Sequence, residues 1–121
     1  MARLLIVDDE TSILSALRRS LRREGWEIVT AESPREAIRI LDAQRIDLVL
    51  SDQMMPGMTG IELFSEVSKR QPEAKKILIT GWSEEVPSEA LAAVDVKALI
   101  AKPWDDAELK QILHAHLDEV A

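Results

Sequence analysis

The chain contains no cysteine and no tyrosine. Without cysteine, neither a disulfide framework nor a thiolate metal site is available. No apolar run approaches the roughly 20 residues that a membrane-spanning helix needs, and no leader of basic and then apolar residues precedes the first apolar run. We therefore expect a cytoplasmic protein that does not bind a membrane.

Positive charge is also scarce. Against 22 aspartates and glutamates there are 15 lysines and arginines, and the formal net charge is −7. The aromatic residues are Trp26, Phe64, Trp82 and Trp104. Because a protein that binds phosphate backbones needs a basic face, we expect no direct contact with nucleic acid.

The sequence does have enough apolar material for one domain. Of its 121 residues, 46% are hydrophobic, which supports one packed core and a single domain over residues 1–121. Short apolar runs that lack clear alternation are typical of strands covered by helices on both faces. Five such runs predict five strands, at residues 4–7, 28–29, 48–50, 77–79 and 98–101.

Segments with helical spacing lie between these runs. The first carries leucines at 14, 17 and 21 on one face, and we expect it to end at Gly25 as its C-terminal cap. A second helix is expected to begin at Ser33, with Pro34 in its first turn. A third is expected to stop near Pro72, and a last one begins at residues 105–108, which resemble a capping box.

The fourth helix is interrupted by Pro87. An interior proline costs a helix about 3 kcal/mol, so we expect an irregular loop up to about residue 86 and a short helix from Pro87 onwards. Strand and helix thus alternate five times. Right-handed crossovers and short connections favour an α/β fold of the flavodoxin type, a doubly wound parallel sheet in the order 2-1-3-4-5, with ligands bound beyond the carboxyl ends of the strands.

Polar side chains follow four of the apolar runs at that edge. Asp8 and Asp9 follow the first run, Asp52 the third, Thr80 the fourth and Lys102 the fifth. Two like charges about 4 Å apart repel by about 4 kcal/mol at an effective dielectric near 20, so three carboxylates in one crevice require protonation, a cation or both. Hard oxygen ligands favour Mg²⁺ or Mn²⁺ over zinc.

An ammonium and a hydroxyl would complete a site for an anion, and these are parts that phosphoryl transfer uses. No histidine lies near in sequence to act as a base, so a carboxylate can itself be the nucleophile. We favour Asp52, because Asp8 and Asp9 are adjacent and suited to holding the metal. Taken singly, each of these residues is more often an ordinary helix cap, turn or loop residue, and only their joint pattern favours a site.

Four motifs taken together resemble the receiver domain of two-component response regulators, the CheY-like domain. They occur in the order and spacing of that family, and the resemblance runs from Arg3 to about Leu117. The motifs are LLIVDDE at residues 4–10, SDQMMPGMTG at 51–60, ITG at 79–81 and KPW at 102–104.

The resemblance implies a phosphorylation site with a metal. Asp52 would accept a phosphoryl group from a phosphohistidine on a sensor histidine kinase or a histidine phosphotransfer protein. Asp9, Asp52 and the backbone carbonyl of Met54 would ligate Mg²⁺, with Asp8 acting largely through coordinated water; Mn²⁺ is an alternative ion.

The resemblance also assigns contacts to the phosphoryl group. Lys102 would pair with one phosphoryl oxygen, the Thr80 hydroxyl would turn inward to another, and the backbone N–H groups of Met54 and Gly81 would contact the rest. A cis peptide bond is expected between Lys102 and Pro103. Such a domain is no enzyme acting on a separate substrate, although it catalyses its own phosphorylation and dephosphorylation.

Signalling would switch the surface formed by the fourth helix, fifth strand and fifth helix. The family usually has an aromatic residue three positions before the lysine, where this chain has Leu99. Trp82 and Trp104 flank the pocket, and the sequence does not decide whether either one switches. The effector domain or partner is also undetermined, and both a monomer and a phosphorylation-dependent homodimer are compatible with the sequence.

Two other functions compete with this one. A receiver-like interaction module could work without phosphorylation, which the retained acids, threonine and lysine disfavour. A haloacid-dehalogenase-like phosphatase would need an acid at position 54, where this chain has Met54, and a cap segment for which 121 residues leave no room.

Overall fold

The computed structural model describes residues 1–81 and 86–118 and contains one parallel sheet. Its strand order is β2-β1-β3-β4-β5, as the sequence predicts. The strands extend over the predicted apolar runs and a few flanking residues: β1 Arg3–Val7, β2 Glu27–Ala31, β3 Leu48–Asp52, β4 Lys75–Thr80 and β5 Val96–Ala101.

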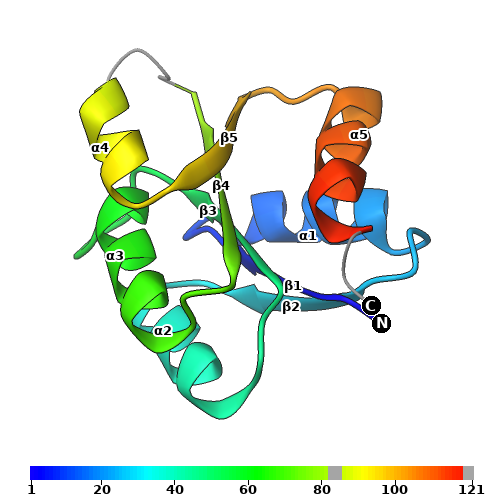
Figure 1. Ribbon diagram of the computed structural model, residues 1–121. Coiled ribbons are helices and arrows are strands. Elements are labelled where there is room, and N and C mark those ends of the chain that lie inside the picture. Colours follow the sequence, from blue (N-terminus) through cyan, green and yellow to red (C-terminus); the bar gives the residue numbers. More distant parts are fainter. Residues whose placement is uncertain (82–85, 119–121) are drawn as a thin grey trace.

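Helices cover both faces of the sheet, as Figure 1 shows. On one face, α1 (Thr11–Leu21) and α5 (Asp106–Leu117) pack with sheet residues such as Ile6 and Leu50. On the other, α2 (Pro34–Ala43), α3 (Gly60–Arg70) and α4 (Ser88–Ala93) lie over residues such as Leu5 and Val49. Successive residues of a strand therefore point into the cores on opposite faces of the sheet. Because both cores are apolar, the strands contain continuous apolar runs. No helix in the described ranges is long and apolar enough to cross a membrane.

Helix starts follow the predicted signals. The Ser33 side chain accepts a hydrogen bond from the Glu36 N–H at 3.1 Å and Pro34 opens α2. The Asp105 side chain likewise accepts from the Glu108 N–H at 2.9 Å at the start of α5. These side chains satisfy N–H groups that the first helical turn leaves without partners.

The predicted end of the first helix is wrong. Helix α1 ends at Leu21, its last buried residue, with Arg22 as its C-cap. Gly25 lies in the following turn, where its φ of +90° turns the chain into β2. Glycine is favoured there because a side chain would clash with the backbone at positive φ.

The proline in the fourth segment has the predicted effect. Helix α4 begins at Ser88, and Pro87 is its N-cap with an extended ψ of 143°. Residues 82–85 of the preceding loop, among them Trp82, lie outside the described residues, so the two roles considered for Trp82 stay untested.

Candidate functional site

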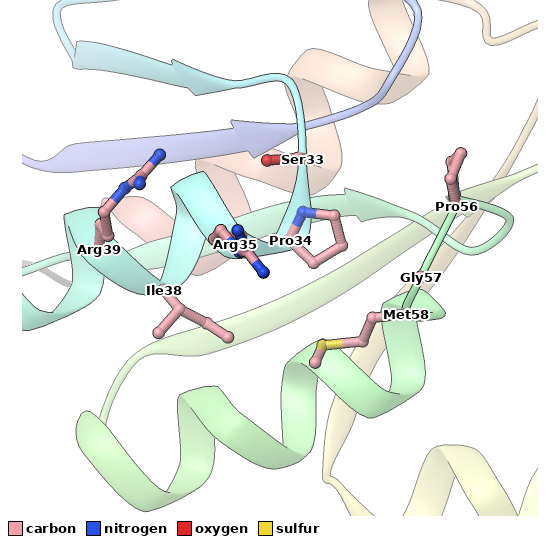
Figure 2. Close-up of a pocket in the computed structure, with 8 residues that line it drawn as sticks. All are labelled: Ser33, Pro34, Arg35, Ile38, Arg39, Pro56, Gly57 and Met58. Atoms are coloured by element: carbon pink, nitrogen blue, oxygen red, sulfur yellow. The ribbon is translucent and has the colours of Figure 1, made fainter.

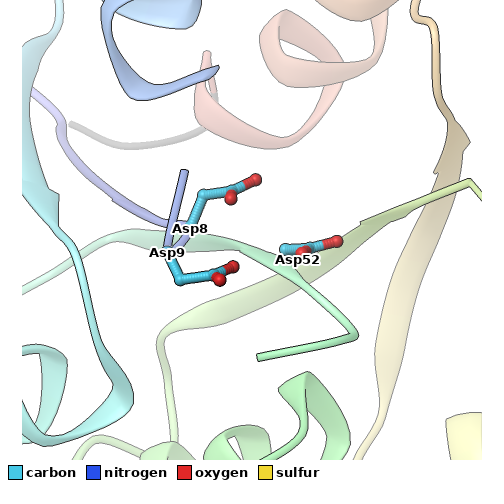
Figure 3. A group of neighbouring side chains, drawn as sticks. All are labelled: Asp8, Asp9 and Asp52. Carbon is cyan, nitrogen blue, oxygen red and sulfur yellow. The ribbon is translucent and has the colours of Figure 1, made fainter. Parts of the chain in front are cut away.

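Three carboxylates converge at the carboxyl end of the sheet. Asp8 and Asp9 directly follow β1, and Asp52 is the last residue of the neighbouring strand β3. Figure 3 shows the Asp8 and Asp9 side chains extending towards the side of the pocket where Asp52 lies. Each residue has a carboxylate oxygen within 4.8 Å of an oxygen of the other two. Asp8 and Asp52 are buried, whereas Asp9 is exposed and gives the cluster access to solvent.

Lys102 lies between two of these acids. Its Nζ is 3.1 Å from Oδ2 of Asp8 and 3.2 Å from Oδ1 of Asp52. It directly follows β5, and its backbone N–H donates to the Thr80 carbonyl at 2.9 Å, which joins the ends of β4 and β5. The peptide bond from Lys102 to Pro103 is cis, as predicted.

The remaining candidate residues lie at the same edge of the sheet. Thr80 is the last residue of β4 and only 2% exposed, and it is in register with Ala101. Gly81 follows it and is exposed. Met54 lies in the loop after β3, with 60% of its surface exposed. The fold thus brings every predicted site residue to this edge because parallel strands all end there.

The acidic pocket carries more negative charge than Lys102 can neutralise. Burial is the largest influence on the pKa of Asp52 and raises it; the Lys102 charge lowers it and the Asp8 charge raises it. Burial also disfavours the Lys102 ammonium, but its hydrogen bond to Asp8 and the charges of Asp52 and Asp8 raise the pKa of Lys102 overall. Lys102 therefore stays charged and neutralises only part of the acidic cluster.

The donor set fits a hard divalent cation. When all four groups are ionised, three carboxylates and one ammonium leave two negative charges, which one divalent ion balances. Carboxylate oxygens without histidine or cysteine are the ligands that Mg²⁺ prefers. An ion held by two or three of them would relieve the repulsion that raises the Asp52 pKa.

The loop after Asp52 is fixed by backbone contacts. The Gly60 N–H donates to the Gln53 carbonyl at 2.9 Å, and the Gln53 side chain accepts from the Ile61 N–H at 3.0 Å. A capping box between Thr59 and Glu62 starts α3. The start of α3 is thereby tied to the residue that follows Asp52, so the acidic pocket has a rigid wall.

Leu99 and Trp104 occupy different environments. Leu99 pairs with Leu78 in the sheet and packs against the core beneath α2, α3 and α4. Trp104 packs against the core of the opposite face, and its Nε1–H donates to Asp106 at 3.0 Å. Trp104 therefore covers the start of α5 in this conformation.

His114 of α5 lies in a contact network that no motif of the sequence indicates. Its two ring nitrogens lie 2.9 Å from Glu24 and 2.9 Å from Asp118, and its ring centroid is 4.5 Å from that of Trp26. Only the Asp118 contact has a sequence signal, the i,i+4 spacing along α5. Glu24 and Trp26 are about 90 positions away in sequence.

The sequence model of the response regulator receiver domain matches residues 4–114. This chain belongs to that family. Transcriptional regulatory protein GlrR of Escherichia coli is 37% identical over 120 residues, which cover 99% of this receiver domain and 27% of GlrR. Hydrogenase transcriptional regulatory protein HoxA of Cupriavidus necator is 40% identical over 106 residues, covering 85% of this chain and 21% of HoxA. The receiver domain thus spans about a quarter of the length of these relatives.

Solved structures share the whole fold. A CheY-like receiver domain from Methanospirillum hungatei has a TM-score of 0.92 and 33% identity, covering 98% of this chain and 95% of that one. Response regulator TrrA of Thermotoga maritima, solved with Mg²⁺ and BeF, has a TM-score of 0.87 and 36% identity, covering 97% of this chain and 100% of that one. The receiver domain is therefore a signalling domain of a two-component system, and neither the phosphatase nor the phosphorylation-independent module is favoured.

Proposed function

We propose that residues 1–121 form one receiver unit that takes a phosphoryl group onto Asp52. The observation that supports this is the position of the Asp52 carboxylate. Like Asp8, it is buried and close to the Lys102 ammonium, at 3.2 Å, but Asp52 is itself the last residue of the central strand β3, at the edge where the other site residues meet. Asp9, more exposed, and Asp8, bonded to the Glu10 N–H at 2.9 Å, are better suited to hold a cation.

The proposed step is a transfer between two residues. An oxygen of Asp52 forms a bond to phosphorus while the bond from phosphorus to the donor's histidine nitrogen breaks. The electron pair of that bond returns to the imidazole nitrogen, which takes up a proton from solvent. During the transfer, the Lys102 ammonium moves from the Asp52 carboxylate to a phosphoryl oxygen. There its charge-assisted hydrogen bond stabilises the negative charge that develops on that oxygen. Water reverses the modification by attacking phosphorus and releasing inorganic phosphate.

The other candidate residues orient the same group. In this proposal the Thr80 hydroxyl donates to a second phosphoryl oxygen, and the N–H groups of Met54 and Gly81 contact the remaining ones. Asp8, Asp9, Asp52 and the Met54 carbonyl would hold Mg²⁺, or Mn²⁺ in its place. When bound, the ion would supply positive charge that offsets the negative charge of the phosphoryl group. Autocatalytic dephosphorylation belongs to the same proposal.

The proposed partners are inferred from the family and from the length of its relatives. A sensor histidine kinase or a phosphotransfer protein is the proposed donor, in the cytoplasm. The relatives GlrR and HoxA are about four to five times longer than the segments they share with this chain and are transcriptional regulators, so we propose that the signal passes to an effector unit or partner. The proposed output surface is α4, β5 and α5, in a monomer or a phosphorylation-dependent homodimer.

Intact mass after incubation with acetyl phosphate and Mg²⁺ tests the proposal. We expect an adduct with the mass of one phosphoryl group, formed by the parent and absent in Asp52→Asn. Asp95→Asn is the matched control, because Asp95 precedes β5 at the opposite edge of the sheet. An unmodified parent would support the module that works without phosphorylation, and an adduct that persists in Asp52→Asn would place the acceptor elsewhere.

A further inference from the structure

A groove on the described surface lies away from the acidic pocket. It has a volume of about 480 Å³ and runs between the start of α2 and the loop that follows β3. Figure 2 shows Ile38 of α2 and Met58 of the loop facing one another across it. Pro34 and Pro56 add further apolar surface. Ile38 and Met58 remain partly exposed, so the groove leaves apolar side chains in contact with water.

Two arginines line this apolar groove. Arg35 and Arg39 are exposed and lie one helical turn apart on α2, the spacing that places side chains on the same helix face. Within residues 1–81 and 86–118, neither guanidinium forms an ion pair. By contrast, Arg3, Arg45 and Arg70 each pair with an acid.

The groove is attached to a fixed framework. One wall is the start of α2, where Ser33 caps the helix and Pro34 occupies its first turn. The other is the loop tied to α3 through the bond from Gly60 to Gln53. A site formed by two anchored walls does not need ordering when a ligand binds, which reduces the entropic cost of association.

The chemistry of the groove specifies its ligand. An apolar floor accepts an aliphatic side chain, and two guanidiniums one turn apart match two carboxylates one turn apart on a facing helix. The flanking residues Arg35, Pro56 and Gly57 are exposed, so the groove is open along its rim, unlike the enclosed pockets that bury most of a small ligand. We propose that this groove docks an acidic amphipathic helix of a partner protein, with leucine-like side chains against Ile38 and Met58 and carboxylates on Arg35 and Arg39.

This surface is separate from the one proposed for output. The docking groove is formed by α2 and the loop before α3, whereas the proposed output surface is formed by α4, β5 and α5. The two surfaces can therefore be occupied independently. The docking proposal also does not depend on phosphorylation of Asp52.

A charge-exchange experiment tests the proposal on the full chain. The probe is a fluorescein-labelled, alanine-based helical peptide with two leucines and two glutamates on one face, followed by fluorescence anisotropy. A second peptide carries lysines in place of the glutamates, and a third carries alanines in place of the leucines. We expect saturable binding of the first peptide, weakened about tenfold or more in the Arg35→Glu/Arg39→Glu variant, and a gain of lysine-peptide binding by that variant.

The matched control is Arg19→Glu/Arg23→Glu, which changes the net charge equally at two exposed residues outside the groove. We expect it to bind the acidic peptide like the parent. Methyl NMR signals of Ile38 and Met58 should shift on titration. Equal weakening in both double variants, equal binding of the peptide without leucines, or no binding to the parent would each overturn the proposal.

Discussion

At the scale of single residues, Gly60 shows how closely the chain packs beside Asp52. A Cβ at position 60 would lie 2.5 Å from the Asp52 carbonyl oxygen and 2.7 Å from Cδ1 of Leu78. A backbone oxygen cannot move away as the end of a side chain can. We therefore expect Gly60→Ala to lower the free energy of unfolding by about 1–3 kcal/mol, measured by urea denaturation.

Gly81→Ala is the comparison for this prediction. Among residues 1–81 and 86–118, a Cβ at position 81 would meet only the Cβ of Lys102, at 4.0 Å, which is an ordinary contact. We expect its unfolding free energy to stay within about 0.5 kcal/mol of the parent. If both variants lost the same stability, the close approach at Gly60 would not be the cause.

His114 gives the fold a pH dependence whose sign follows from its partners. The hydrogen bond to Glu24, and then that to Asp118, raise the pKa of His114 above the ordinary value of a histidine. Protonated His114 therefore stabilises the folded state. This contribution is complete below the unfolded pKa and is lost as pH rises through the folded pKa. Because 36% of the side chain is exposed, we expect no more than about 1 kcal/mol.

The measurement is the difference in unfolding free energy between the parent and His114→Gln. We expect a larger loss at about pH 5.5 than at about pH 8.5, since only the lower pH keeps the imidazolium in both states. His116→Gln is the comparison variant on the same helix, because its ring makes no hydrogen bond with the described residues. An equal loss at both pH values would mean that His114 contributes packing on Trp26 rather than charge.

The site residues could be predicted to lie together because the sequence shows that each follows a strand, and parallel strands end at the same edge of the sheet. Which of these residues form ion pairs with one another could not be predicted. Lys102 lies between Asp8 and Asp52, and the choice of these acids over Asp9 depends on side-chain directions that neighbouring strands determine. The contact from His114 to Glu24 likewise depends on the packing of α5 beside the turn after α1.

At the scale of secondary-structure elements, α3 and α4 differ sharply in what stabilises them. Helix α3 has 11 residues, a capping box and four buried residues. Helix α4 has six residues, no side-chain bond at its N-cap and no buried residue. Short helices depend on tertiary packing, so α4 should open more readily than α3.

Native-state hydrogen exchange measures this difference directly. We expect amide protection in α4 to be lower than in the centre of α3 by at least about tenfold, which is about 1.4 kcal/mol in opening free energy. Amides of β4 serve as the internal reference, since five of its six residues are buried. Equal protection in the two helices would show that α4 opens only with the whole domain.

Element boundaries were predictable where one residue carries the signal. Ser33 and Pro34 start α2, and Pro87 delays α4, because each acts on the backbone of its own turn. The end of α1 was not predictable from Gly25, since the helix stops where Leu21 makes its last buried contact. Helix ends determined by packing need the positions of the neighbouring elements, which a local sequence signal does not contain.

At the scale of the whole molecule, the proposed metal site in the acidic pocket predicts that stability depends on Mg²⁺. The folded state holds three carboxylates within a few ångströms of one another with one ammonium between them, and burial raises the pKa of Asp52. Folding without a cation therefore disfavours the charged form of Asp52. At neutral pH and without metal, we expect Asp52→Asn to melt at a higher temperature than the parent.

Mg²⁺ should reverse this order. A ligand that binds only the folded state stabilises it by about 2.7 kcal/mol at a concentration 100 times its Kd. The parent, with all three carboxylates, should gain this stabilisation, and Asp52→Asn should gain much less because it lacks one of the proposed ligands. Thermal melts with Mg²⁺, with a chelator, and with sodium chloride at matched ionic strength show whether the melting temperatures of the parent and Asp52→Asn change order. Equal gains in parent and variant would mean that Mg²⁺ acts by screening the net charge of −7 rather than at this pocket.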